Sequence, residues 1–278
     1  MSNSNFKKLP VMLRYAALTA IVANTIPVSF AQVPDIYSQN STLPNMSESN
    51  ADMRKDKGII GFAAMSGQNA GGKTNFQIAP IIEYHWASGW FAGTRQGIGY
   101  SFTQNPDLQY GAFLNADLGR PPSGQANGIK GISPKPVLGT FANYSLTHEW
   151  ILSSSLRYGA GDNGQGATID LGTNYNYEIS PWMHLGAGIG ATLANASYMQ
   201  SYFGVNAEQS QSTGYAQYTP SAGLKDARAN LTLHFNVNKE VAITTGLTAT
   251  RLSAAAKNSP SINPSDSVSG LMAVSYTF

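Results

Sequence analysis

The sequence contains no cysteine, and this absence excludes several kinds of site. There can be no disulfide bond, no lipid-modified cysteine, no cysteine-ligated zinc and no thiol nucleophile. An exported chain without disulfides must be stabilised by its own packing, or by closure of its sheet, which leaves no strand edge unpaired.

The sequence is also poor in charge and in long apolar runs. Only 12% of its residues are charged, whereas it has 28 glycines, 14 tyrosines and 11 phenylalanines. After the first 31 residues, no apolar stretch approaches the roughly 20 residues of a membrane-spanning helix. No basic patch with interleaved aromatic residues is present, which argues against nucleic-acid binding. The composition therefore favours an aromatic, glycine-rich β protein.

Residues 1–31 have the pattern of a secretory signal peptide that is cleaved on export. Three basic residues precede a short apolar run at 16–23, and Ser29 and Ala31 place small residues before a cleavage point. The alternative, an amphipathic first helix, is disfavoured because no charge interrupts residues 15–31. Removal of this segment leaves 14 basic and 15 acidic residues, a formal charge of −1.

Residues 32–57 are rich in Ser, Asn, Asp and Pro without any period, and they are expected to form a flexible periplasmic lead-in. From residue 58 to residue 278, alternation with a period of two dominates, as in strands with two different faces. It is clearest in 167–179, 227–237 and 268–278. Strands of this length exceed those of most soluble proteins and match the 9–11 residues of a tilted membrane-spanning strand. The fold class is therefore an all-β, transmembrane antiparallel β-barrel.

Eight further segments are candidate strands: 58–66, 75–86, 89–102, 109–119, 138–147, 149–160, 182–195 and 240–252. Termini on one side of the membrane require an even number of strands. Residues 125–133 are therefore expected to supply a twelfth strand, with ten strands as the alternative if 109–119 does not span. Long polar stretches at 196–226 and 253–267 contrast with very short connections elsewhere, an asymmetry typical of outer-membrane barrels. All four tryptophans lie beside the short connections, where an interfacial girdle would place them: Trp86, Trp90, Trp150 and Trp182.

One loop carries a resemblance to a known family. Tyr198, Tyr202-Phe203-Gly204-Val205, Tyr218, Pro220 and Gly223 resemble the hallmark loop of the MipA/OmpV family of outer-membrane proteins. The segment 80–86, Gly119-Arg120 and 258–260 are similar to other family segments, so that the resemblance covers about residues 58–278. The first loop departs from the family pattern, because 66–72 has neither its Pro nor its Tyr.

The resemblance implies a non-enzymatic scaffold that links a lytic transglycosylase to a penicillin-binding protein in murein assembly. Family members are also described as adhesins or as factors in small-molecule uptake. Membership of such a family is a better guide to where a protein is located than to what it does. The location it implies is the outer membrane of a Gram-negative bacterium, in contact with outer-membrane lipid.

If the apolar face of each strand meets lipid, a polar set faces the lumen, because charge in the hydrocarbon is costly. This set comprises Glu83, His85, Arg95, Asp117, Arg157, Asp170, Glu178, Arg228 and His234. Its mixed signs favour ion pairs that fill the barrel; the alternative is a pathway for small polar solutes.

No catalytic signature of serine, histidine or metal-ligand type is present, and no cofactor or metal site is expected. The tyrosine-rich loop admits two interpretations: an adhesive, exposed surface, or an inward fold of Tyr202, Phe203 and Tyr215 that caps the barrel mouth. At the C-terminus, one face of the last strand forms the expected recognition signal for the barrel-assembly machinery: Met272, Val274, Tyr276 and Phe278.

Overall fold

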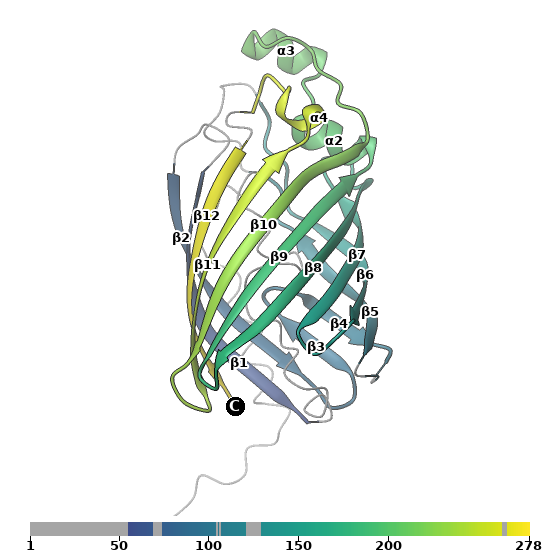
Figure 1. The fold of residues 1–278 in the computed structure, drawn as a ribbon. Coiled ribbons are helices and arrows are strands. Elements are labelled where there is room, and N and C mark those ends of the chain that lie inside the picture. The colour runs from purple at the N-terminus through teal and green to yellow at the C-terminus, as the bar shows by residue number, and fades with distance from the viewer. Residues whose placement is uncertain (1–54, 69–73, 104, 106, 121–128, 263–265) are drawn as a thin grey trace, which may run out of the picture.

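The computed structural model describes residues 55–68, 74–103, 105, 107–120, 129–262 and 266–278, and these form a closed antiparallel barrel of twelve strands (Figure 1). The expected signal peptide, 1–31, and residues 32–54 of the expected lead-in lie outside the described residues. The strands are β1 (Lys57–Gln68), β2 (Thr74–His85), β3 (Trp90–Gly93), β4 (Gly97–Ser101), β5 (Leu108–Asp117), β6 (Lys135–Ser145), β7 (Trp150–Ala160), β8 (Gly166–Ser180), β9 (Met183–Ala194), β10 (Gly223–Asn236), β11 (Val241–Leu252) and β12 (Asp266–Thr277).

Each strand pairs with the next along the chain, and β12 pairs with β1 to close the wall. At this seam Ile59 lies opposite Thr277, and Gly58 and Phe278 exchange two backbone hydrogen bonds of 2.8 and 2.9 Å. The prediction of a twelve-stranded antiparallel barrel is confirmed.

The origin of the twelfth strand differs from the expectation. The segment 89–102 forms two short strands, β3 and β4, instead of one long strand. The proposed crossing at 125–133 is wrong: 125–128 lie outside the described residues, and 129–133 contribute only an isolated bridge between Ile132 and Arg120. The strand at 109–119 does cross the wall, as β5, so the ten-stranded alternative is also wrong.

The alternation of the sequence becomes an outward apolar face and an inward face of polar or small residues. Leu138 and Ile189, for example, point outward and are well exposed. Inward-facing Ala79, Ala63 and Ala273 lie opposite one another on β2, β1 and β12. An exposed apolar belt around a closed sheet is the surface that a bilayer requires.

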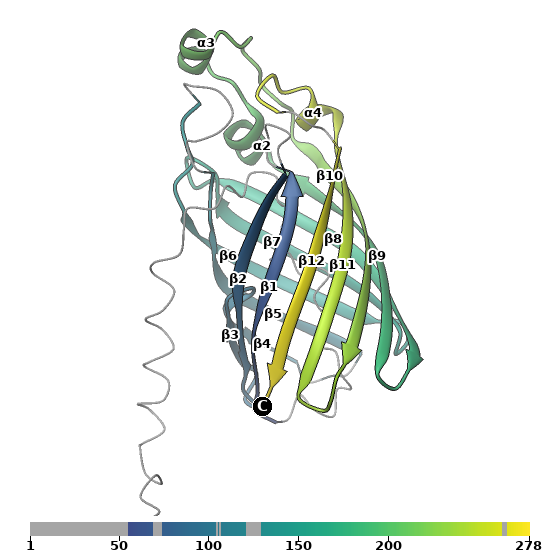
Figure 2. The same ribbon diagram turned by 90° about the vertical axis from the view of Figure 1, so that its left-hand side faces the viewer.

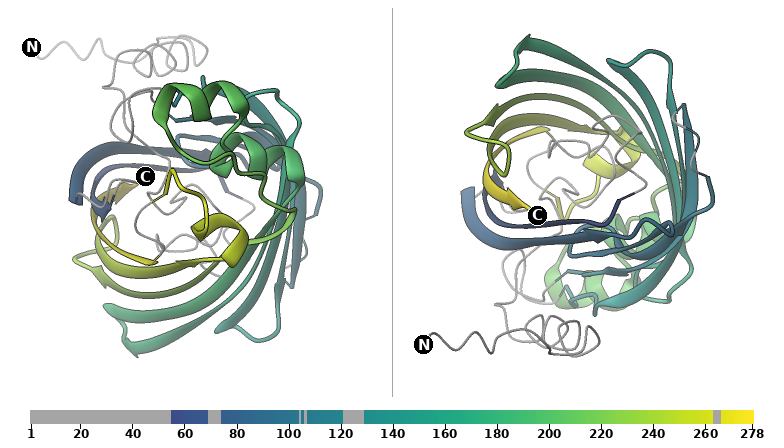
Figure 3. Two further views of the ribbon diagram at one scale, coloured as in Figure 1. Left: turned by 90° about the horizontal axis from the view of Figure 1, so that it is seen from above. Right: turned by 90° about the horizontal axis from the view of Figure 1, so that it is seen from below.

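The two ends of the barrel differ (Figures 1 and 2). The four tryptophans lie at the end with the short connections, in or beside the turns at 86–89, 146–149 and 181–182. The opposite end, called the mouth here, carries α2 (Ala196–Phe203), α3 (Ala207–Thr213) and α4 (Ala254–Lys257). In the view from above, α4 lies within the outline of the barrel (Figure 3). None of the described helices is long and apolar enough to cross a membrane.

Candidate functional site

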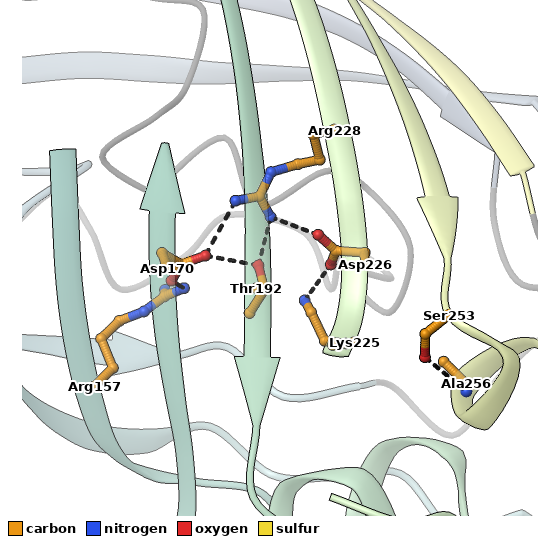
Figure 4. Close-up of polar contacts among 8 residues, drawn as sticks. All are labelled: Arg157, Asp170, Thr192, Lys225, Asp226, Arg228, Ser253 and Ala256. Atoms are coloured by element: carbon orange, nitrogen blue, oxygen red, sulfur yellow. Dashed lines mark hydrogen bonds and ion pairs between the residues drawn. The ribbon is translucent and has the colours of Figure 1, made fainter. Parts of the chain in front are cut away.

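A connected set of five charged side chains and one threonine faces the lumen beneath the mouth, across β7, β8, β9 and β10 (Figure 4). We call it the polar network; its members are Arg157, Asp170, Thr192, Lys225, Asp226 and Arg228. Asp170 lies at its centre, with its Oδ2 atom 2.8 Å from Nη2 of Arg157 and its Oδ1 atom 3.1 Å from Nη2 of Arg228. The hydroxyl of Thr192 donates a third hydrogen bond to Asp170, at 2.7 Å.

The second carboxylate of the network extends it along β10. Asp226 accepts from Nη1 of Arg228 at 2.9 Å, and its other oxygen lies 2.9 Å from Nζ of Lys225. Both carboxylates are buried, and each contacts two cations. Because buried charges are tolerated only when paired and hydrogen-bonded, the arrangement is that of a compensated interior cluster.

The polar network continues into helix α2 above it. Nζ of Lys225 lies 5.6 Å from the centroid of the Tyr198 ring, which stacks on Tyr202 at 4.5 Å. The Tyr202 hydroxyl donates to Asp117 of β5 at 2.5 Å, and burial, aided by its neighbours Tyr198 and Asp117, raises the pKa of that hydroxyl. The hydroxyl therefore remains a proton donor, and it joins the loop after β9 to β5, four strands away along the wall.

An apolar cluster covers the polar network on the mouth side. We call it the mouth cluster; its members are Ile132, Ala194, Met199, Tyr202, Phe203 and Ala256. Met199 of α2 and Ala256 of α4 are 0% exposed. The guanidinium of buried Arg120 donates to the backbone oxygen of Tyr202 at 2.9 Å. Loops that are far apart in the sequence thus share one core at the mouth.

Local sequence signals explain why the loop after β9 folds in this way. Asn195 caps α2 by accepting from the backbone N–H of Tyr198 at 2.8 Å, as a helix N-cap does. After the helix, Val205 pairs with Tyr218 in an antiparallel bridge, and Val205 is almost fully buried. The Tyr218 hydroxyl donates to the backbone oxygen of Ala255, which draws the loop toward α4.

The residues of the family loop motif therefore lie in or beside the mouth cluster. Tyr198, Tyr202, Phe203 and Val205 pack inward, Gly204 ends α2, Pro220 is buried, and Gly223 begins β10 with a φ of 134°. Tyr215 is only half-buried. Helix α3, between the two halves of the motif, has no buried residue.

The remaining members of the expected lumen set lie apart from the polar network. Glu83 and Arg95 form a looser pair, 3.8 Å between Oε1 and Nε, with His85 nearby on β2. His234 contacts Thr244 and Asn236 through its two ring nitrogens at 2.9 and 3.0 Å. Glu178 shares the face of Asp170 on β8 but is exposed near the short-turn end.

Three members of the polar network, and Arg120, were not among the residues expected from the sequence. Lys225 and Asp226 precede the segment 227–237, yet Asp226 continues its even-numbered inward face by one more step. Thr192 is a neutral residue whose role depends on the strands beside it. The even-numbered position of Asp226 was the available sequence signal that its side chain faces the lumen. No signal in the sequence pointed to Thr192.

A model of the family "MltA-interacting protein MipA" matches residues 60–278, nearly the whole described barrel. The chain belongs to the MipA family. No curated protein sequence matches it. MipA membership and the exposed apolar belt place the protein in the outer membrane of a Gram-negative bacterium, where short turns are periplasmic and the mouth is extracellular.

Solved outer-membrane barrels are similar to this MipA-family chain in outline only. The NanC porin has a TM-score of 0.43 at 10% identity, and the match covers 77% of this chain and 98% of the porin. The KdgM porin has a TM-score of 0.43 at 12% identity, and the match covers 79% of this chain and 99% of the porin. The Pseudomonas putida toluene transporter TodX has a TM-score of 0.39 at 10% identity, and the match covers 84% of this chain and 91% of the transporter. No conclusion about function follows from likenesses this distant.

The Tyr202→Phe variant tests the link between α2 and β5. It removes the hydroxyl that donates to Asp117 and leaves a partly buried carboxylate short of one donor. A loss of about 1–3 kcal/mol in the free energy of unfolding is expected. Urea titration in lipid vesicles measures it. In the same loop, Tyr215→Phe is the control, because the Tyr215 hydroxyl makes no hydrogen bond among the described residues, and equal losses would contradict the assignment.

Proposed function

We propose that this MipA-family chain is a non-conducting, non-enzymatic outer-membrane barrel that acts as an interaction scaffold for a murein transglycosylase of the MltA type. The supporting observation is the filled upper lumen, where the polar network and the mouth cluster join α2, α4 and five strands. In the part of the chain that the structure describes, side chains paired in this way form no ring of a single charge, which a selective channel would need. The family description supplies the class of partner.

In this proposal the partner docks at the periplasmic end, because murein lies on that side of the membrane. The turns there are short, but the chain that precedes β1 leaves from the same rim. Asp56 holds that departure point by accepting from the backbone N–H of Ala87 at 2.9 Å and from the Tyr84 hydroxyl at 3.3 Å. The 32–57 lead-in and this rim are therefore the candidate docking surface, also for a penicillin-binding protein.

The experiment is a pull-down of a purified MltA-type transglycosylase by the refolded barrel. Deletion of residues 35–55 is expected to weaken binding by about tenfold or more, which corresponds to at least 1.4 kcal/mol. Deletion of 207–213, which removes α3 at the opposite end, is the matched control and is expected to leave binding unchanged. Unchanged binding after both deletions would count against the lead-in as the docking element. No binding by the intact barrel would overturn the scaffold.

A channel for small polar solutes is the second candidate, and one feature of the lower lumen favours it. Between the polar network and the periplasmic end, β8 and β10 point amides and hydroxyls inward, among them Asn174, Asn230 and Thr232. Planar-bilayer recordings separate the two functions. Silence is expected from the scaffold, whereas stepwise conductance that Arg157→Ala alters would support the channel. An adhesive role would use α3, whose side chains are all accessible.

A further inference from the structure

Among the described residues, strand pairing is incomplete between β2 and β5, although the barrel closes through the β3–β4 hairpin. Only the last three of the twelve residues of β2, Glu83 to His85, pair with β3. On the other side, β4 pairs only with residues 111–114 of β5. The β3–β4 hairpin turns at 94–96, so that no strand among the described residues lies between 74–81 of β2 and 115–117 of β5. Figure 2 shows the two short strands in the lower part of the wall beside β2.

The backbone at the lower corners of this gap is satisfied by side chains instead of by a strand. The Thr94 hydroxyl accepts from the N–H of Ile82 and donates to the oxygen of Pro80, both at 3.2 Å. Across the gap, Asn115 accepts from the N–H of Ala116 at 2.8 Å and donates to the oxygen of Arg95 at 3.0 Å. Such partners are what exposed backbone requires at membrane depth.

Pro80 also protects the edge of β2 against pairing with another strand. The backbone groups of even-numbered residues point toward β3, as the 2.8 Å bond from Thr94 N–H to the oxygen of Ile82 shows. Pro80 belongs to this set and has no N–H to offer. Proline on an edge strand opposes the addition of another strand. The gap is therefore not suited to a strand from a partner protein.

The end of the short hairpin is held by close packing, so the gap is a fixed feature of the wall. Glu83 is buried and accepts from the backbone N–H of Arg95 at 3.1 Å. Its other carboxylate oxygen lies against Gly93, where an added Cβ would overlap it. A side chain at 93 would displace Glu83, whose Oε1 atom accepts from the N–H of Arg95 in the turn.

On β2, residues 78–82 beside the gap carry apolar side chains on both faces of the wall. On the outside, Phe76 and Ile78 are 82% and 77% exposed, the highest values among the large apolar side chains described. On the inside, Ala79 and Ile81 of β2 face the lumen, whereas Asn115 and Asp117 carry the inward face of β5 across the gap. The route from the bilayer to the lumen is therefore apolar along β2 and polar along β5, which suits a molecule with one apolar chain and one polar group.

We propose that this gap is a lateral doorway that admits a single-chain amphiphile from the bilayer into the lumen. Two strands are missing at a spacing of 4.7–4.9 Å, which leaves about 10 Å for one hydrocarbon chain and the flanking side chains. The chain lies against Ala79 and Ile81, and the head group hydrogen-bonds to the gap-facing backbone of Phe76 and Ile78. This function is separate from the proposed scaffold and does not depend on a protein partner.

The absence of cysteine allows a direct test with single introduced cysteines. Ala79→Cys faces the lumen at the gap, whereas Ala273→Cys faces the lumen on the same ladder level behind an intact wall. Each variant carries a small thiol-linked fluorophore and is reconstituted with brominated or ordinary phosphatidylcholine. Bromine is expected to quench Ala79→Cys about as strongly as the outward Ile78→Cys and to leave Ala273→Cys unaffected. Quenching at Ala79→Cys no greater than at Ala273→Cys would overturn the doorway.

Photo-crosslinking tests the unmodified barrel, so that no introduced probe can distort the wall. A diazirine-bearing C16 fatty acid in the vesicle is expected to label Ala79 and Ile81, and excess palmitic acid is expected to reduce the yield. Lumen-facing Asn174 and Asn176 of β8, far from the gap along the wall, are the internal control and should remain unlabelled. Adducts confined to outward-facing residues would overturn the proposal.

Discussion

Replacing Asp170 by Asn is expected to lower the free energy of unfolding of the barrel by about 3–5 kcal/mol. Asp170 is 2% exposed and provides the carboxylate for both Arg157 and Arg228. The neutral amide keeps the shape of the side chain but removes the carboxylate charge that Arg157 and Arg228 share. A buried charge that loses its partner costs far more than a pair contributes when intact.

The matched control for this variant is Asp266→Asn at the mouth end of β12. Its pairing with Arg251 is 3.7 Å long, and both side chains are mostly exposed, so a loss of less than about 1 kcal/mol is expected. Urea unfolding in vesicles, followed by tryptophan fluorescence, measures both variants. Similar losses at Asp170 and Asp266 would mean that the polar network is solvated and does not fill the lumen.

Replacing residues 196–222 by a short Asn-Gly turn is expected to convert a silent barrel into one with stepwise conductance. The deletion removes α2, and with it Met199, Tyr202 and Phe203 of the mouth cluster. Since this apolar core lies between the polar network and the extracellular medium, its loss exposes the ion pairs to water and salt. Planar-bilayer recording of the refolded variant measures the change.

Deletion of α3 alone, residues 207–213, is the control for the loop replacement. It shortens the same loop but removes no buried residue, and it is expected to leave the barrel silent. Continued silence after removal of 196–222 would mean that the lower lumen is closed by its own side chains. Conductance after loss of α3 alone would show that the mouth cluster is not the barrier.

Alternation in the sequence was sufficient to predict the long strands and their faces. The expected segments 167–179, 227–237 and 268–278 lie within β8, β10 and β12, apart from one or two end residues. The signal is strong there because a closed barrel in lipid gives every strand one apolar and one inward face. Asp170, Arg157 and Arg228, which the same reasoning assigned to the lumen side, form ion pairs with one another.

The hairpin in the middle of the wall could not be read from alternation. Gly93 lies opposite Gly97, with three residues in the turn between them, so both strands keep odd-numbered residues inward. An odd number of turn residues preserves the parity of the pattern, and 89–102 therefore resembles one continuous strand. Gly97, with a φ of 75°, was the remaining local sign of a turn.

The packing of the tyrosine-rich loop was undecided at the sequence level, because its partners lie far away along the chain. Tyr202 contacts Arg120 and Asp117, and Met199 shares a core with Ala256. Such contacts depend on the closure of the barrel and leave no period within the loop itself. The inward interpretation holds for Tyr202 and Phe203, and only in part for Tyr215.

The seam between β1 and β12 also sets the order of events in biogenesis. Ile59 and Thr277 are neighbours in the wall although almost the whole barrel sequence separates them. Contacts of such high sequence separation form slowly, because the entropy cost of loop closure must be overcome before any free energy of strand pairing is gained. The wall cannot close until the last residues have been delivered to the membrane. A nascent or truncated chain therefore has two unpaired strand edges, and it is the state most exposed to aggregation and proteolysis.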